Sequence, residues 1–396
     1  MAFASPPSSS PGSSPGPDHG SGARERSQTA ATNLFTARRL WWVVAASVIA
    51  AVGVALVGGI QGSTWQALVN VDVAWEWVGV ACLAVVVRDV GYMVRLGVLT
   101  QGHLGKKRTA SSILLWELAS ALTPSVVGGS AVAAFILHRN GLTWGRSLAT
   151  VMATAMLDEM FFILAVLGVA LVAGTGAFLP QAAPWIEGSL GAVFAGGCGF
   201  MLGLAVFLAC ALLLNPRGVN QTLLGLSSRK VLMRWKDRIA SLANDLLEAS
   251  RSLRSMPTLS WGLASLATVA SWTARFATLH VLLLAVVEPL VDAMGGQAAE
   301  GLSHAAVWAR QLAMWTVLMI SPTPGSAGLA EFALPAFMQD LMPCVLAPAA
   351  WTAIVLLWRW LTYHIYLLVG AVLMPFWVAQ TSAPNHRSSR NFEAHE

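Results

Sequence analysis

Residues 321–331 read SPTPGSAGLAE, a run broken by proline and glycine that carries one carboxylate and lies between apolar segments. Residues 122–131, LTPSVVGGSA, form a second broken run in the first half of the chain. Proline removes a backbone donor and glycine loosens a helix, so such a run persists inside a membrane only where it is buried in protein or lines a polar cavity. Paired interruptions in two halves of a chain are typical of a transport site near mid-membrane.

The composition places most of the chain in a membrane. Apolar side chains make up 56% of the 396 residues, charged side chains only 11%, and the mean hydropathy is +0.64. A soluble globular protein carries about 25% charged residues. The apolar runs reach the roughly 20 residues that a membrane-spanning helix needs, and the alternation typical of barrel strands is missing. The sequence therefore predicts an all-α fold, a polytopic bundle of transmembrane helices.

Lysine and arginine residues gather in short loops beside the apolar runs, and this bias predicts the side of the membrane on which each loop lies. Both termini are expected in the cytoplasm. The broken segments, residues 111–137 and 305–337, each begin and end on one side. We therefore expect two re-entrant hairpins of opposite orientation, the first entering from inside. The six full spans are expected near residues 41–60, 74–99, 147–173, 190–214, 259–287 and 348–376.

The sequence predicts a membrane domain between two polar ends. Residues 1–37 are rich in serine, proline and glycine and offer few large apolar side chains, so we expect a disordered cytoplasmic tail. Residues 38–376 form the expected membrane domain, and residues 377–396 form a second cytoplasmic tail. Within residues 215–256, apolar side chains recur every three or four positions, which predicts a cytoplasmic amphipathic helix. The sequence does not decide whether this helix lies on the anionic inner leaflet or is a solvated linker between two halves of the bundle.

Several classes of function are disfavoured by the sequence. The net charge of +5 comes from loops beside spans rather than from one soluble face, so no nucleic-acid partner is expected. The four cysteines show no CxxC or Cys/His spacing, which argues against a metal site. No nucleophile elbow, P-loop, dinucleotide fingerprint or HExxH motif occurs. We therefore expect no catalytic residue, no cofactor and no metal.

Ionisable side chains inside the apolar segments are candidates for a binding site. Each costs at least a few kcal/mol at the centre of a membrane helix, so such groups face the interior and pair or bind something. Arg88 and Tyr92 share one helix face, and Arg359 and Tyr363 repeat the spacing, so each pair is expected to present a cation to an anionic headgroup. The residues expected to balance charge, or to couple movement to protons or sodium, are Asp89, Glu117, Asp158, Arg275 and Glu331.

The broken runs themselves supply backbone donors at half-helix ends, which favour phosphate or carboxylate. Two alternatives stay open: the runs are simple kinks packed by neighbours, or Arg88 and Arg359 only neutralise carboxylates such as Glu331 in structural ion pairs. The headgroup-binding positions expected in the runs are Pro124, Gly128, Gly129, Pro324, Gly325 and Gly328. The side chains expected to reach out to a membrane interface are Arg95, Glu159 and Arg310.

Two stretches of the second half, PTPGSAGLAEFAL and VLLWRWLTYHIYLLVG, resemble the lysylphosphatidylglycerol synthase transmembrane family, also called the flippase-like family. That family shows a P-x-P-G-x-x-G-x-x-E pattern followed by a last helix that contains arginine. The resemblance covers about residues 38–376. It implies a stand-alone flippase-like domain, without the aminoacyl transferase domain of the bifunctional multiple peptide resistance factors. The matching positions are Pro322, Pro324, Gly325, Gly328, Glu331, Arg359 and Tyr363.

We expect a lipid translocase of the plasma or inner membrane, which moves a lipid with an anionic or zwitterionic headgroup through a polar cavity. The expected partners are membrane lipids; a homodimer, and enzymes of lipid or glycan synthesis, are partners that the sequence leaves open. Two other classes also stay open. One is a membrane-embedded lipid-modifying enzyme with Glu331 or Asp158 as general base, and the other is an accessory scaffold for envelope lipid or glycan synthesis. Because no catalytic motif occurs, the sequence favours the transporter.

Overall fold

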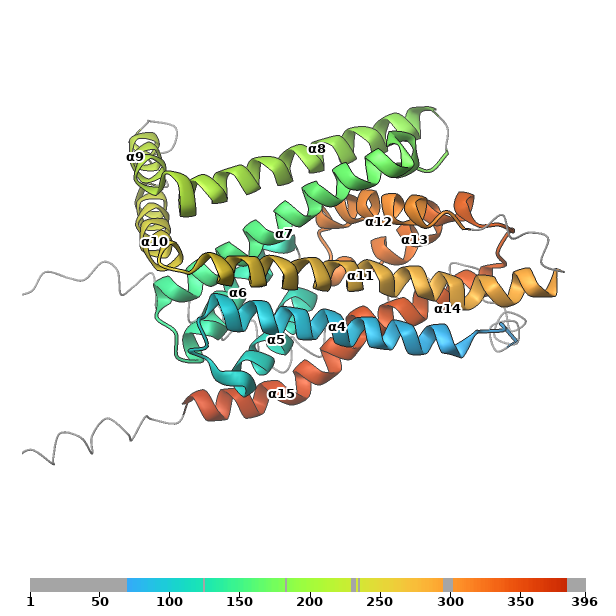
Figure 1. Cartoon of the computed structure of the whole chain (residues 1–396), viewed down its shortest axis with the longest axis horizontal. Helices are drawn as coiled ribbons and strands as arrows, with labels where there is room; N and C mark the ends of the chain where they lie inside the picture. Colours follow the sequence, from blue (N-terminus) through green and yellow to red (C-terminus); the bar gives the residue numbers. More distant parts are fainter. Residues whose placement is uncertain are drawn as a thin grey trace, which may run out of the picture.

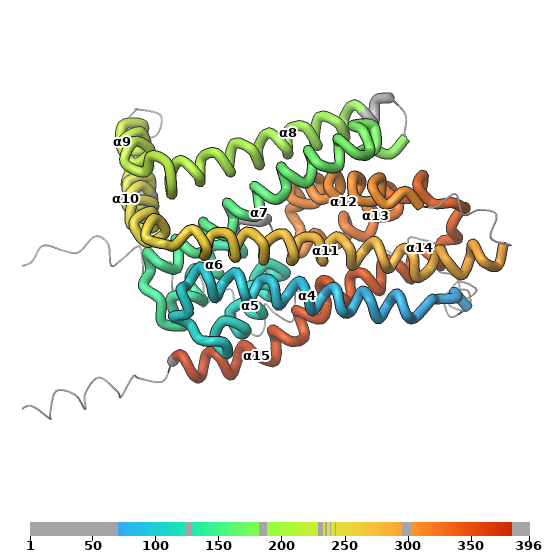
Figure 2. Tube along the Cα trace, in the orientation of Figure 1, coloured from blue at the N-terminus to red at the C-terminus, as the bar shows by residue number. Residues whose placement is uncertain are grey.

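The structure, a computed structural model, describes residues 70–123, 125–181, 184–228, 233, 236–294 and 302–382. These residues form helices and no strand, so the all-α prediction is confirmed. The long helices run side by side, and the shorter α9 and α10 lie across one end of them (Figure 1, Figure 2). The α-helices are α4 (Trp75–Leu99), α5 (Gly105–Leu122), α6 (Ser125–Arg139), α7 (Trp144–Ala173), α8 (Pro184–Ala209), α9 (Pro216–Ser227), α10 (Lys236–Arg254), α11 (Thr258–Ala293), α12 (His304–Met319), α13 (Leu329–Met338), α14 (Pro348–Arg359) and α15 (Ile365–Ser382).

Several helical segments are long and apolar enough to cross a membrane. Their positions agree with five of the six spans expected from the sequence. The sixth, at residues 41–60, lies outside the described residues, as do the expected tail at 1–37 and residues 383–396. The five segments found are Trp75–Leu99, Trp144–Ala173, Gly188–Leu214, Thr258–Ala293 and Pro348–Thr381.

The last helix is longer than the sequence predicted. α15 continues to Ser382, through residues 377–382 that were assigned to the C-terminal tail. Trp377 is buried, and its indole Nε1 donates a hydrogen bond to Asn140 Oδ1 at 2.7 Å. This contact with the chain just after α6 holds the extra helical turns against the bundle.

Each Pro/Gly run contains a helix break. The first break lies before Ser125, so the prediction that Gly128 and Gly129 lie at a half-helix end is wrong, because both fall inside α6. α5 ends at Leu122, α6 begins at Ser125, and the two helices pack against each other. α12 and α13 also pack together and are joined by residues 320–328, which include the 3-10 turn η4 (Pro324–Ser326). Figure 1 shows α5 and α6 toward the end of the bundle that α10 covers, and α12 and α13 toward the opposite end. This placement agrees with two hairpins of opposite orientation, and their entry into a membrane stays a prediction.

The most extensive helix pair among the described residues is α4 with α11, which lie side by side (Figure 1). A β-carbon added at Gly91 of α4 would lie 2.2 Å from Ser271 Oγ and 3.0 Å from the carbonyl oxygen of Ala267. Small residues allow such close approach of membrane helices. The approach also lets Ser271 Oγ donate a hydrogen bond to the carbonyl oxygen of Arg88 at 3.1 Å.

Replacing Gly91 with valine is expected to lower the free energy of unfolding by about 1–3 kcal/mol, because the added atoms overlap α11. Gly79→Val is the matched control, since a β-carbon on Gly79 of the same helix meets nothing within 4 Å. Thermal unfolding of the detergent-purified proteins measures both. Equal midpoints for the two variants would contradict the close packing of α4 on α11.

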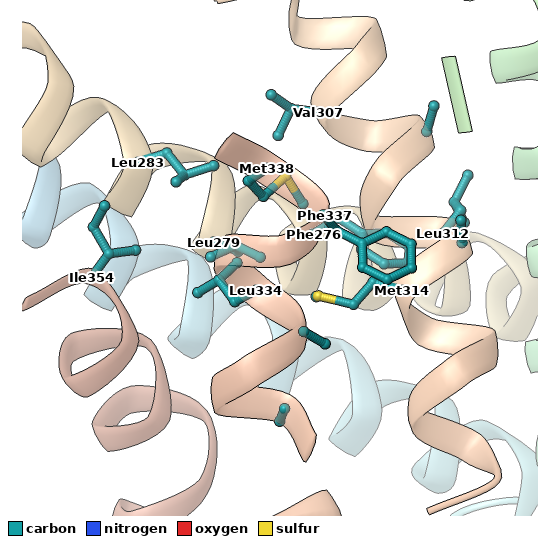
Figure 3. Packing of buried hydrophobic residues seen from close by; sticks show 14 of the residues in the cluster. Phe276, Leu279, Leu283, Val307, Leu312, Met314, Leu334, Phe337, Met338 and Ile354 are labelled. Atoms are coloured by element: carbon teal, nitrogen blue, oxygen red, sulfur yellow. The ribbon is translucent and has the colours of Figure 1, made fainter. Parts of the chain in front are cut away.

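The largest apolar cluster gathers side chains of α11, α12, α13 and α14. Leu279 and Leu283 of α11, Leu334 and Phe337 of α13, and Ile354 of α14 are buried in it (Figure 3). Between membrane helices such side chains stabilise the packing through van der Waals contact, because the lipid tails they would otherwise meet are equally apolar. The cluster therefore fixes α13, and with it one arm of the second broken segment, against the long helix α11.

The amphipathic segment at residues 215–256 differs from its prediction as one helix. It forms two helices, α9 and α10, and the periodic residues from Ile239 to Leu253 fall in α10 alone. Leu246, Ala249 and Leu253 are buried in a cluster with side chains of α7 and of the π-helix η2 (Cys210–Leu214). The apolar face of α10 is therefore covered by protein. The sequence analysis had considered a helix on the inner leaflet and a solvated linker helix.

Candidate functional site

A cavity of about 350 Å³ lies inside the bundle, between the two broken segments. Its walls also include α4, α7 and α11, so segments far apart in the sequence meet around it. The first broken segment contributes Trp116, Glu117, Ser120, Thr123 and Ser130. The second contributes Gln311, Trp315, Thr323, Gly325 and Ser326.

Charged side chains from several helices line this cavity within the described part of the chain. Charge inside a membrane protein is costly unless it is paired or bound, so the partner of each group decides what the cavity can hold. The cations are Arg95 of α4, Arg275 of α11 and Arg359 of α14. The carboxylates are Glu117 of α5 and the adjacent Asp158 and Glu159 of α7.

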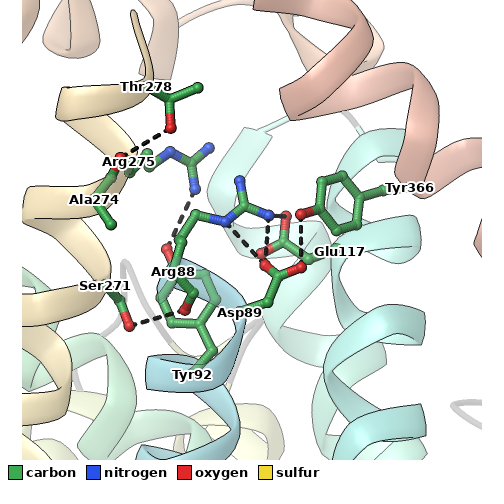
Figure 4. A network of polar contacts seen from close by, with 9 residues as sticks. All are labelled: Arg88, Asp89, Tyr92, Glu117, Ser271, Ala274, Arg275, Thr278 and Tyr366. Carbon is green, nitrogen blue, oxygen red and sulfur yellow. Dashed lines mark hydrogen bonds and ion pairs between the residues drawn. The ribbon is translucent and has the colours of Figure 1, made fainter. Parts of the chain in front are cut away.

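Arg88 lies behind the cavity wall, in a network that joins α4, α5 and α15 (Figure 4). Its Nε and Nη2 donate to Asp89 Oδ1 at 3.1 and 2.9 Å, and Nη2 lies 3.7 Å from Glu117 Oε2. The guanidinium carbon is 4.6 Å from the ring centroid of Tyr366, whose hydroxyl donates to Asp89 Oδ2 at 2.8 Å. Arg88 is completely buried. These contacts favour the alternative in which Arg88 neutralises carboxylates.

Arg359 is also paired. Its Nε lies 2.8 Å from Glu331 Oε1, and Glu331 Oε2 accepts a hydrogen bond from the Gly328 N–H at 2.7 Å. The pair therefore ties the start of α13 to the end of α14. The guanidinium carbon of Arg359 is 4.0 Å from the ring centroid of Tyr363, in the π-helix η6 (Trp360–His364).

Gly325 is one of two positions where the second broken run needs glycine; the other is Gly328, with φ of +86°. Gly325 has a φ of +55°, a left-handed conformation that costs a side chain free energy. A β-carbon there would lie 2.1 Å from the Tyr363 ring, so the ring covers the turn directly. The adjacent Ser326 shares this conformation, with φ of +54°, and its Oγ donates to the carbonyl oxygen of Leu318 at 2.9 Å. The turn is therefore held in a strained shape by α12 and η6.

Arg95 lines the cavity, although the sequence analysis expected it at a membrane interface. It is 6% exposed and forms an ion pair with Asp158, and its Nη1 lies 3.3 Å from Thr268 Oγ1. Asp158 Oδ1 also accepts a hydrogen bond from Trp272 Nε1 at 2.7 Å. The signal for Arg95 was present, since it lies seven residues after Arg88 on the same helical face.

The expectation that Arg95, Glu159 and Arg310 reach out to a membrane interface is wrong, because all three are buried in protein. Arg310 Nη2 lies 2.6 Å from Asp340 Oδ2, which also accepts a hydrogen bond from the Gln181 backbone N–H at 3.0 Å. Glu159 faces the cavity and forms no ion pair with any residue that the structure describes. Hydropathy alone did not show that these positions face inward.

Arg275 has a different environment from the other arginines. Among the described residues it has no carboxylate within ion-pair distance, although the sequence predicted a charge-balancing role. Its guanidinium carbon lies 4.6 Å from the ring centroid of Trp315 and 5.4 Å from that of Trp272. Its Nη1 donates one long hydrogen bond, of 3.4 Å, to the Tyr92 hydroxyl.

The predicted site residues fall into three groups. Those that line the cavity are Tyr92, Glu117, Asp158, Arg275, Gly325, Arg359 and Tyr363. Those that do not line it are Arg88, Asp89, Gly129, Pro324, Gly328 and Glu331. Pro124 lies outside the described residues, and Gly128 is placed only as part of α6. Within the described ranges no group of three histidine, cysteine or acidic residues is arranged to hold a metal.

The long apolar helices define a polytopic helical membrane protein, and charged side chains line a cavity within it. The chain belongs to the family described as the lysylphosphatidylglycerol synthase TM region, whose model matches residues 27–370. This match confirms the resemblance seen in the second broken run and the last span. No curated protein and no solved structure matches the chain.

Proposed function

We propose that this protein is a lipid translocase, which moves a lipid with an anionic or zwitterionic headgroup between the two leaflets and returns it chemically unchanged. The cavity carries the proposal. It lies between both broken segments and gathers cations and carboxylates from α4, α5, α7, α11 and α14 inside an otherwise apolar bundle. A cavity lined by charged side chains among apolar helices is what a headgroup needs in order to cross hydrocarbon.

The size and surroundings of the cavity support this function. Its volume of about 350 Å³ lies at the small end of the range of about 300–1,000 Å³ that is usual for ligand sites, which suits a headgroup without its acyl chains. The outward faces of the long helices are apolar, with exposed side chains such as Leu83, Leu164, Leu171 and Phe200. The head would occupy the cavity while the tails stay against such faces.

The proposal includes a topology and a location. The two broken segments enter the membrane from opposite sides, and both termini lie in the cytoplasm, beside the plasma or inner membrane. The partners are the membrane lipids themselves. The carboxylates that face the cavity, Glu117, Asp158 and Glu159, are the groups through which protons or sodium would couple to movement.

Transbilayer movement of lipid in reconstituted vesicles tests the proposal. Vesicles that contain the protein and tail-labelled phosphatidylglycerol or phosphatidylethanolamine are expected to expose inner-leaflet label to an external quencher faster than empty vesicles. Ala155→Trp fills the cavity and is expected to reduce the rate to that of empty vesicles, whereas Ala195→Trp, on the exposed face of α8, keeps it. No gain over empty vesicles with any labelled lipid would overturn the proposal.

Mass spectrometry of the lipid recovered from the same vesicles separates movement from chemistry. Unchanged lipid is expected. A new lipid mass that appears with the wild-type protein and not with Ala155→Trp would favour the lipid-modifying enzyme instead. Function in cells that survives Ala155→Trp would favour the accessory scaffold, because a scaffold does not use the cavity.

A further inference from the structure

We propose that Arg275 is the phosphate-binding residue of the cavity and that Gln311 supplies a second donor to the same phosphate group. This inference rests on the proposed function for the source of the phosphate, a lipid headgroup. The residues come from α11 and α12, and both line the cavity.

The first argument is the pairing of charge. Arg95 is paired with Asp158, Arg359 with Glu331, and Arg88 with Asp89 and Glu117. Within the part of the chain that the structure describes, Arg275 is the cavity cation without a carboxylate partner. An anion that enters the cavity can therefore pair with Arg275 without displacing a carboxylate of the described part of the protein.

The second argument is the geometry of the guanidinium. Trp272 and Trp315 meet edge to face at 86°, and Arg275 lies beside both rings, in the corner that they form. Contacts with aromatic rings hold a guanidinium in place without using its N–H groups. The N–H donors lie at its edge, and the long bond to Tyr92 uses only one of them. The remaining donors form a fixed fork, which matches two oxygens of a phosphate.

The third argument is a buried donor without a partner. Gln311 is 3% exposed, it lines the cavity, and its Nε2 has no hydrogen-bond partner among the described residues. A buried donor left unsatisfied costs about 1–3 kcal/mol, and an acceptor that occupies the cavity, such as a phosphate oxygen, would satisfy it. Each oxygen of an anionic group accepts more than one hydrogen bond, so one phosphate can accept from both the Arg275 fork and Gln311.

Lipid binding to the full-length protein in detergent micelles tests the site, with microscale thermophoresis as the readout. The probes are dioctanoyl phosphatidate, dioctanoylglycerol, which has the same tails without phosphate, and inorganic phosphate. Phosphatidate is expected to bind more tightly than dioctanoylglycerol. Both Arg275→Gln and Arg275→Lys are expected to weaken phosphatidate binding about ten- to hundredfold, because lysine keeps the charge and loses the fork. Neither is expected to change dioctanoylglycerol binding.

Arg251→Gln, which removes an exposed arginine of α10, is the matched control and is expected to leave all affinities unchanged. Wild-type phosphatidate affinity in Arg275→Gln would show that Arg275 does not bind the phosphate. Wild-type affinity in Arg275→Lys would show that the two-pronged guanidinium geometry is not needed. Inorganic phosphate that binds as tightly as phosphatidate would support the phosphate site and contradict a lipid as its source.

Gln311→Leu tests the site with little expected cost to the fold, because it removes a buried amide nitrogen that has no partner among the described residues. It is expected to raise the unfolding temperature and still to weaken phosphatidate binding about tenfold. Unchanged binding in this variant would show that Gln311 is not part of the site.

A translocation assay distinguishes the phosphate site from the translocase proposal. If phosphatidate binds at Arg275 but no lipid moves, the phosphate site stands and the translocase proposal fails. If lipid moves equally well with Arg275→Gln, the translocase proposal stands and the phosphate site fails.

Discussion

Replacing Arg359 with methionine is expected to lower the free energy of unfolding by about 3–5 kcal/mol, because it leaves the Glu331 carboxylate buried without its cation. Arg359 and Glu331 are 6% and 3% exposed, so water reaches neither group well. Glu331 also accepts the Gly328 N–H, and the unpaired charge would therefore disturb the turn that begins α13. Thermal unfolding of the purified protein in detergent, followed by intrinsic fluorescence, measures the change.

A double-mutant cycle separates the pair from the side chains. Glu331→Gln keeps an acceptor for the Gly328 N–H and removes the charge, so Arg359→Met combined with Glu331→Gln is expected to recover much of the lost stability. The control is Lys107→Gln, at an exposed position of α5, which should unfold as the wild type does. Strictly additive effects of the two substitutions would show that the ion pair does not stabilise the fold.

Replacing Arg88 with methionine is expected to have the larger effect, because Arg88 is completely buried and faces two carboxylates. Without the guanidinium, Asp89 and Glu117 would repel each other in a poorly solvated site, and removal of one partner of such a network costs about 3–5 kcal/mol or more. The expected result is a low yield of folded protein and a markedly lower unfolding temperature in the same fluorescence assay.

Neutralising the two carboxylates should reverse this loss. The triple variant Arg88→Met, Asp89→Asn and Glu117→Gln carries no net charge in the network, so it is expected to fold better than Arg88→Met alone. Asp89→Asn also keeps an acceptor for the Tyr366 hydroxyl. If Arg88→Met folds normally while lipid movement stops, then Arg88 binds the headgroup, as the sequence predicted, and is not a structural cation.

The arginines differ in role: Arg88 and Arg359 are structural cations, and Arg275 is the proposed ligand-binding cation. The sequence singled out Arg88 and Arg359 because each lies on one helical face with a tyrosine, and the structure pairs both with acidic residues. Arg275 carries no such local pattern, yet it is the cation that faces the cavity without a carboxylate among the described residues. Spacing along one helix shows which side chains share a face, and it says nothing of what the opposite helix brings to that face.

The helical elements were largely predictable because their signals are local. Residue by residue hydropathy located five of the described spans, and the two Pro/Gly runs marked both helix breaks. The amphipathic segment was less predictable, since its period identified α10 but not the separate α9 or the cover that α7 provides. An apolar stripe has the same period whether lipid or protein covers it.

The sequence by itself determined that this is a helical membrane protein, where its helices break, and to which family it belongs, because apolar length and Pro/Gly chemistry act within a few residues. Only the tertiary structure decided which charges are paired and which face the cavity. Tyr366 and Asp89, for example, bond across 277 positions, and Arg95 and Thr268 across 173. The electrostatic environment of a buried charge depends on neighbours brought together by packing, and no local pattern contains that information.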